Sequence, residues 1–174
     1  RNFNYGQNYA SGNNWKKAID YIKNNDDIHE VILSGGDPLM LSTNALKKLS
    51  DQLVLIKHIK TLRIHTRIPL VSPNRINSDF LNWLESIPLK KVMVIHSNHA
   101  NELNSELKQV FNAISKTRTL LLNQSVLLKG INDDVNSLSD LSHKLFDFGV
   151  LPYYLNQLDK ANGTHHYRIG NKKA

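Results

Sequence analysis

The chain has 174 residues, a formal net charge of +7 and an ordinary globular composition, with 40% apolar and 21% charged residues. It contains no cysteine, which excludes disulfides, thiolate metal ligands and a cysteine nucleophile within these residues and is consistent with a reducing, cytoplasmic location. No apolar run approaches the roughly 18 residues of a membrane span, and the lysines are scattered, so we expect neither a membrane nor a nucleic-acid partner.

Helical and strand patterns alternate along the chain. We expect helices over residues 14–23, 42–56, 78–87, 101–116 and 133–148, and strands over residues 31–33, 62–65, 92–95, 120–122 and 150–155. This alternation predicts an α/β fold with a parallel sheet, and we expect residues 1–174 to form a single domain. Either an open doubly wound sheet or part of a β/α barrel fits, because a complete eight-unit barrel takes about 250 residues.

The carboxyl end of every expected strand is followed by hydrogen-bonding residues. In parallel α/β folds, ligands bind at this edge of the sheet. Since buried polar groups must be matched or they cost stability, five polar strand ends favour a ligand site over the ordinary polarity of loops. The five groups cover residues 34–37, 65–67, 96–99, 123–125 and 156–159.

The first of these groups is the stretch SGGD, which ends a buried strand. Gly35 and Gly36 allow a positive φ or a close approach of backbone to ligand, and Asp37 could accept hydrogen bonds from a ligand ammonium. A tight turn capped by Asp37 is the alternative, and both interpretations stay open. The stretch lacks the GxxxxGK[ST] and GxGxxG patterns of phosphate-binding loops.

Histidines are frequent near the same edge, but they lack the spacing of a known metal motif. No HExxH or CxxC pattern accompanies them, so hydrogen bonding to a polar ligand is favoured over metal ligation. No GxSxG nucleophile pattern is present either. The histidines in question are His65, His96, His99, His165 and His166.

Five motifs together resemble the lysine 2,3-aminomutase family of radical S-adenosylmethionine (SAM) enzymes. They cover nearly the whole chain in order: VILSGGDPLM, LRIHTRIPLVSPNRI, NHANE, LLNQSVLLKGIND and PYYLNQLDKANGTHHYRI. The ending LDKxxGxxH is most similar to the branch that makes (R)-β-lysine for the modification of translation elongation factor P. The resemblance implies a partial β/α barrel with parallel strands, of the radical SAM type.

The resemblance also implies a reaction and its cofactors. In this family a [4Fe–4S] cluster binds SAM and cleaves it to a radical, which abstracts hydrogen from lysine held on pyridoxal phosphate (PLP). The amino group then moves from C2 to C3, so the enzyme is an isomerase that converts L-α-lysine to β-lysine. The partner implied is this small-molecule substrate. The oligomeric state stays open, a homo-oligomer included.

The resemblance assigns roles to ten positions. Residues that match the SAM-contacting motifs are Ser34, Gly35, Gly36, Asp37, His96 and Gln124. Residues in motifs that line the PLP and substrate region are Arg67, Arg75 and Tyr153. Asp159 matches a carboxylate that binds the side-chain ammonium of lysine, and a desolvated ammonium does need a paired charge.

The chain departs from the family in two places. The family binds its cluster with CxxxCxxC, and RNFNYGQN resembles the stretch just after the third cysteine of that motif. The PLP-binding lysine of the family lies downstream of HHY, and Lys172 and Lys173 do not sit in that motif. We therefore expect no metal ligand and no catalytic residue in this segment, which would lack the N-terminal cluster-binding unit and the C-terminal PLP-lysine region. Alone it would be inactive, either as a truncated or as a decayed homologue.

Two other functions remain open at this point. One is a metal-dependent barrel hydrolase that uses the histidines at the edge of the sheet. The other is a non-catalytic domain that binds SAM, lysine or an acidic partner.

Overall fold

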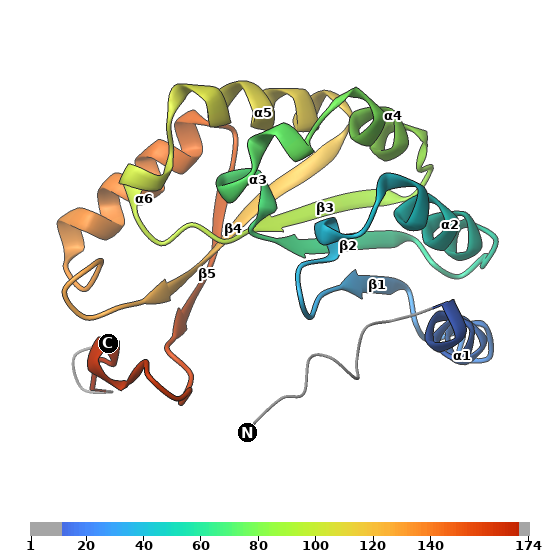
Figure 1. Cartoon of the computed structure of the whole chain (residues 1–174), viewed down its shortest axis with the longest axis horizontal. Helices are drawn as coiled ribbons and strands as arrows, with labels where there is room; N and C mark the ends of the chain where they lie inside the picture. The colour runs from blue at the N-terminus through green and yellow to red at the C-terminus, as the bar shows by residue number, and fades with distance from the viewer. Residues whose placement is uncertain (1–11, 171–174) are drawn as a thin grey trace.

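The computed structural model describes residues 12–170, and its five strands form one parallel sheet. The strands are β1 (Glu30–Leu33), β2 (Thr61–Thr66), β3 (Lys90–Ile95), β4 (Thr119–Leu127) and β5 (Leu151–Gln157). They lie in the spatial order β1-β2-β3-β4-β5, which is also the chain order (Figure 1). A doubly wound sheet reverses its strand order at a switch point. The order found here is that of a β/α barrel, so the expected partial barrel is confirmed.

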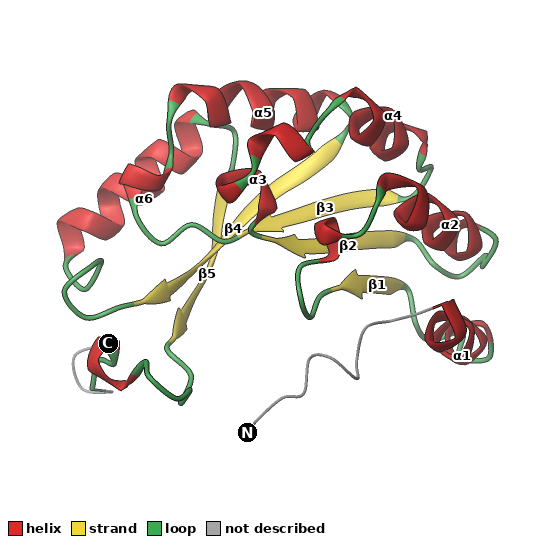
Figure 2. Cartoon of the chain, viewed as in Figure 1, coloured by secondary structure: helices red, strands yellow, loops and turns green. Residues whose placement is uncertain are grey.

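The helices follow one another around the outer face of the sheet (Figure 2). They are α1 (Gly12–Lys23), α2 (Thr43–Val54), α3 (Ile68–Val71), α4 (Ser78–Ser86), α5 (Ser105–Lys116) and α6 (Val135–Asp147). Short 3-10 turns lie at η2 (Pro38–Met40), η3 (Pro73–Arg75), η4 (Ala100–Glu102) and η5 (His165–Tyr167). Within the described residues, none of the helices is both long and apolar enough to span a membrane.

Local capping decides where the helices begin. The side chains of Ser42, Asn77, Asn104 and Asp134 each accept a hydrogen bond from a backbone N–H in the first turn of α2, α4, α5 and α6. The helix that we expected from residue 101 is wrong at its start, because α5 begins only at Ser105. The preceding residues form η4 instead, and α3 and the 3-10 turns are not among the elements that periodicity predicts.

The core lies between the sheet and the helices. Alternate residues of the strands point toward the helices and are buried, as in β2 with Leu62 and Ile64 and in β3 with Met93 and Ile95. They pack with helix residues such as Phe80, Leu84, Leu107 and Phe111. The other strand residues therefore face the opposite side of the sheet, which is the inner side of the partial barrel.

The inner side of the sheet is concave. The guanidinium of Arg63 on β2 lies 5.8 Å from the ring centroid of Tyr153 on β5, although two strands separate β2 from β5. In a flat sheet those strands would be about 14 Å apart, at about 4.8 Å per step. The contact therefore requires the sheet to curve. All of β5 is exposed, and β5 is one of the two edge strands of this sheet.

Candidate functional site at the carboxyl ends of the strands

The loop after β1 contains two glycines, so its backbone is accessible at the edge of the sheet. Gly35 and Gly36 have φ values of +79° and +52°, which an L side chain rarely adopts. A Cβ at either position would meet no atom within 4 Å, so the space beside both glycines is open. Ser34 is exposed at the start of the same loop. The loop can therefore let a ligand approach its backbone closely, as we expected from the sequence.

The carboxylate of Asp37 joins this loop to the end of β2. Oδ1 accepts hydrogen bonds from Leu39 N at 3.0 Å and from the Thr66 hydroxyl at 2.7 Å. Oδ2 accepts from Arg67 N at 2.6 Å and from Ile68 N at 3.3 Å. The alternative of a capped turn is thus present in the structure, since Asp37 caps η2. Both oxygens already have partners within the protein, and the contact of Asp37 with a ligand stays a prediction.

Two imidazoles lie side by side at this edge. His65 comes from β2 and His96 directly follows β3, and their rings meet edge to face with centroids 6.1 Å apart. The Nε2 atoms of both are buried and have no hydrogen-bond partner among the described residues. A buried nitrogen left without a partner costs stability, which a ligand group that pairs with it would restore.

The environment of both imidazoles favours their neutral forms. Burial lowers the pKa of His65, and the nearby Arg63 guanidinium lowers it further. Burial also lowers the pKa of His96, as does His65, while the Asp37 carboxylate acts in the opposite direction. A neutral imidazole can donate at one nitrogen and accept at the other. The sequence placed His65 at the edge without a role, and its pairing with His96 appears only in the fold.

A second carboxylate shapes the loop after β3. Glu102 Oε1 accepts hydrogen bonds from Asn98 N at 2.6 Å and from His99 N at 3.0 Å. Its Oε2 atom accepts from Arg67 Nη2 at 2.9 Å. Because Asp37 binds the backbone of Arg67 while Glu102 binds its side chain, Arg67 connects the loops after β1, β2 and β3. The sequence analysis gave Glu102 no role, although it ends the motif NHANE and forms a capping box with His99.

Polar side chains of β4 complete the edge. The buried Asn123 accepts from Ser97 N at 2.8 Å and donates to Ser97 O at 3.0 Å, so it fixes the chain just after His96. The next residue, Gln124, is half-buried and lies opposite Tyr154 of β5 in the sheet. Neighbouring strand residues point to opposite faces, so Gln124 faces the inner side. It is positioned to contact a ligand there.

Arg75 lies apart from this cluster. Its guanidinium donates to Leu39 O at 3.1 Å, to Leu41 O at 2.8 Å and to Thr43 Oγ1 at 3.1 Å, and it stacks 5.3 Å from the Phe80 ring. These contacts brace the segment between η2 and α2. Its expected contact with PLP or substrate stays a prediction.

Asp159 also lies outside the cluster. It is exposed in the segment after β5 and lines a hollow of about 180 Å³ together with Lys160, His165 and Arg168. Tyr153, by contrast, faces the inner side opposite Arg63. The structure thus gathers Ser34–Asp37, Arg67, His96 and Gln124 along one edge, whereas no hydrogen bond or ion pair of the described residues ties Arg75 or the Asp159 side chain to them.

The chemistry of this edge suits a small polar ligand. Among residues 12–170, no three His, Cys, Asp or Glu side chains are placed to hold a metal ion. The hydrolase interpretation therefore lacks a ligand set in that part of the chain. A [4Fe–4S] cluster has no cysteine to bind it in this sequence. Lys172 and Lys173 lie outside the described residues.

Several curated proteins named L-lysine 2,3-aminomutase are similar to the chain. Those of Buchnera aphidicola, Haemophilus influenzae and Escherichia coli are 49%, 45% and 41% identical to the chain, and each alignment covers 100% of it. The chain covers 51%, 52% and 51% of these three proteins, so it spans about half of their length. No family model matches the chain. Over the portion that aligns, the chain is thus similar to L-lysine 2,3-aminomutases, in line with the resemblance seen in its motifs.

A solved structure supports the fold independently. The structure of native anSMEcpe with bound AdoMet and Kp18Cys peptide superposes with a TM-score of 0.66 over 91% of this chain and 47% of that one. Sequence identity is 15%, so the likeness concerns the fold alone.

Proposed function

We propose that this chain, as a homologue of L-lysine 2,3-aminomutases over its whole length, supplies the SAM-binding part of an enzyme that converts L-α-lysine to β-lysine. The identity of 41–49% along all 174 residues is the observation that carries this proposal. The alignments cover the whole chain, so they include every strand end of the candidate site. The geometry at those strand ends suits the ligand.

The residues at this edge fit SAM. The open backbone of Gly35 and Gly36 offers carbonyl and N–H groups to the amino and carboxylate groups of its methionine part. The unpartnered Nε2 of His96 supplies one further donor or acceptor, and Gln124 supplies an amide. Asp37, through its bonds to the end of β2, holds the glycine loop in place. When bound and cleaved by one electron from a donor outside this chain, SAM would supply the carbon radical that starts the hydrogen transfer, with methionine as the leaving group.

The other two cofactors do not fit the residues of this chain. No cysteine is present for a cluster, and no lysine of the described residues lies in the PLP motif of the family. We assign neither of them a site in this chain. The relatives are about twice as long as the aligned portion, which leaves room for both groups elsewhere in a longer protein.

The experiment uses the intact natural protein that contains these residues. It is incubated with L-lysine, SAM, PLP and a reductant, and β-lysine is measured by mass spectrometry. We expect β-lysine only when SAM is present. Failure to form it from a protein shown to hold cluster and PLP would overturn the proposal.

A variant locates SAM at this edge of the sheet. Gln124→Ala is expected to weaken SAM binding about tenfold, as for the loss of one hydrogen bond of about 1.4 kcal/mol. Gln52→Ala on the exposed side of α2 is the matched control and should bind SAM like the wild type. Equal SAM affinity in both variants would place the ligand elsewhere.

We further propose that the product serves the modification of elongation factor P. The ending LDKxxGxxH, with Asp159 as the partner of the lysine ammonium, supports this choice. The test supplies the product to purified elongation factor P and its lysyl-transferring enzyme, and measures the mass of the modified protein. Transfer no faster than for α-lysine would contradict it. Asp159→Asn should raise the KM for lysine more than it lowers kcat.

A further inference from the structure

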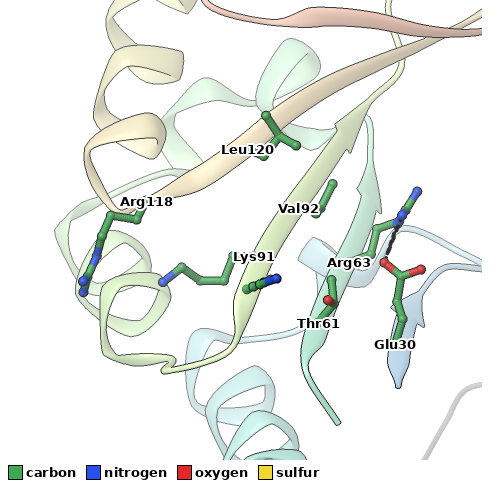
Figure 3. A pocket seen from close by; sticks show the side chains of 8 residues that line it. Glu30, Thr61, Arg63, Lys91, Val92, Arg118 and Leu120 are labelled. Atoms are coloured by element: carbon green, nitrogen blue, oxygen red, sulfur yellow. Dashed lines mark hydrogen bonds and ion pairs between the residues drawn. The ribbon is translucent and has the colours of Figure 1, made fainter. Parts of the chain in front are cut away.

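A second hollow lies at the opposite end of the sheet from the candidate site. It has a volume of about 450 Å³ and lies at the amino ends of β1 to β4 (Figure 3). Four cationic side chains line it, together with a single carboxylate. The cations are Arg63, Lys90, Lys91 and Arg118, and the carboxylate is Glu30. Glu30 is already paired with Arg63 at 2.9 Å, so the other three cations have no acidic partner in the hollow.

Lys91 is the first residue that indicates an anion-binding site. Its residue is 6% exposed, and its ammonium donates one hydrogen bond, to Ile87 O at 3.0 Å. No carboxylate forms an ion pair with it among the described residues. Burial lowers its pKa, the charge of Arg118 lowers it further, and the charge of the Glu85 carboxylate acts in the opposite direction without forming an ion pair. A buried ammonium is costly unless a negative group compensates it.

Arg118 is the second such residue. Its φ of +60° makes it the one non-glycine residue with a positive φ among residues 12–170. It stands just after Thr117, the C-cap of α5, where the left-handed conformation is normally given to glycine. A side chain in that conformation costs about 1–2 kcal/mol. Glycine would adopt this backbone conformation without strain. The chain instead has an arginine there, whose guanidinium lines the hollow.

The hollow is also partly apolar. Val92 and Leu120 line it between the charged groups, and Leu120 is 48% exposed. A single inorganic phosphate would leave most of this volume and this apolar surface unused. Pockets for small organic ligands have volumes of about 300–1,000 Å³ and combine apolar walls with a few polar groups.

We propose that this hollow binds an organic phosphate. Its phosphate group lies against Lys91 and Arg118, with Lys90 beside them, and its organic body covers Val92 and Leu120. The site is separate from the proposed SAM site, because the two lie at opposite ends of the same strands. It does not depend on the proposed function.

The test is calorimetric titration of the intact natural protein with phenyl phosphate, inorganic phosphate and phenol. We expect phenyl phosphate to bind more tightly than inorganic phosphate, and phenol not to bind. Raising the salt concentration should weaken the binding, because salt screens the attraction between the cationic side chains, of which Arg118 and Lys90 are exposed, and the anion.

Two variants locate the binding. Arg118→Gly and Lys91→Met are each expected to weaken phenyl phosphate at least tenfold, whereas Lys16→Gln on the exposed side of α1 should leave it unchanged. Arg118→Gly also removes the backbone strain, so without phosphate its thermal midpoint should equal or exceed that of the wild type. This keeps the test valid if Lys91→Met does not fold.

Three results would overturn the proposal. They are no binding of phenyl phosphate to the wild type, unchanged binding in Arg118→Gly, and inorganic phosphate binding as tightly as phenyl phosphate. Each can occur while the protein still forms β-lysine, so failure here is distinguishable from failure of the proposed function.

Discussion

Replacing Asp37 with alanine would remove the carboxylate that joins the glycine loop to the end of β2. The Thr66 hydroxyl and the N–H groups of Leu39 and Arg67 would lose acceptors that now lie at 2.7, 3.0 and 2.6 Å. Thr66 is 1% exposed, so water does not readily replace the lost acceptor there. We therefore expect Asp37→Ala to destabilise the fold as well as the loop.

The size of the effect follows from these contacts. One hydrogen bond contributes about 1 kcal/mol net, and a buried donor left unpaired costs about 1–3 kcal/mol. Three such contacts predict a loss of about 3 kcal/mol in the free energy of unfolding. In a domain of this size, 1 kcal/mol shifts the thermal midpoint by roughly 2–4 °C, so the midpoint should fall by roughly 6–12 °C.

The assay is urea denaturation of both proteins, followed by circular dichroism. Asp51→Ala is the matched control, because Asp51 forms an exposed pair with Lys47 within α2 and should contribute less than about 0.5 kcal/mol. An unfolding free energy of Asp37→Ala equal to that of the wild type would refute the reasoning. Asp37→Asn keeps the shape and one acceptor oxygen, and about half of the loss is expected.

Three further predictions concern the same edge of the sheet. Gly36→Ala should lower the free energy of unfolding, measured by urea denaturation, by about 1 kcal/mol, because Gly36 has a positive φ. Gly170 has no positive φ, so Gly170→Ala should change this free energy by less than about 0.5 kcal/mol. Equal losses in the two variants would contradict this. Glu102→Gln should lower the free energy of unfolding by about 2 kcal/mol, because two N–H groups lose a charged acceptor. A urea denaturation midpoint equal to that of the wild type would contradict this. Burial lowers the pKa of His65 and His96 in the folded protein, so the unfolded chain takes up protons at a higher pH than the folded chain does. The free energy of unfolding should therefore be unaffected by these histidines above about pH 6.5 and should fall as the pH drops below it. The double variant to glutamine should show a flatter dependence between pH 7 and 5, and an unchanged slope would argue against this origin.

The elements themselves could be predicted because their signals are local. The apolar stripe of Leu46, Leu49 and Leu53 places α2, and Ser42 marks its beginning. The alternation of strands and helices indicates a parallel sheet, and the polar residues after each strand indicate which edge binds a ligand. The start of α5 was missed because a hydrogen-bonded turn, which apolar periodicity does not report, replaces the first helical turn.

By itself, the sequence determined the α/β class, the parallel sheet and the glycine loop, since each depends on neighbours in the chain. Only the tertiary structure decided between a doubly wound sheet and a partial barrel, because that depends on the order in which distant strands pair. It also decided that Asp37 bonds to Thr66, 29 positions away, and that the imidazole of His65 meets that of His96. The cationic hollow likewise forms only because four strands begin side by side. No local sequence pattern predicts which residues such an arrangement brings together.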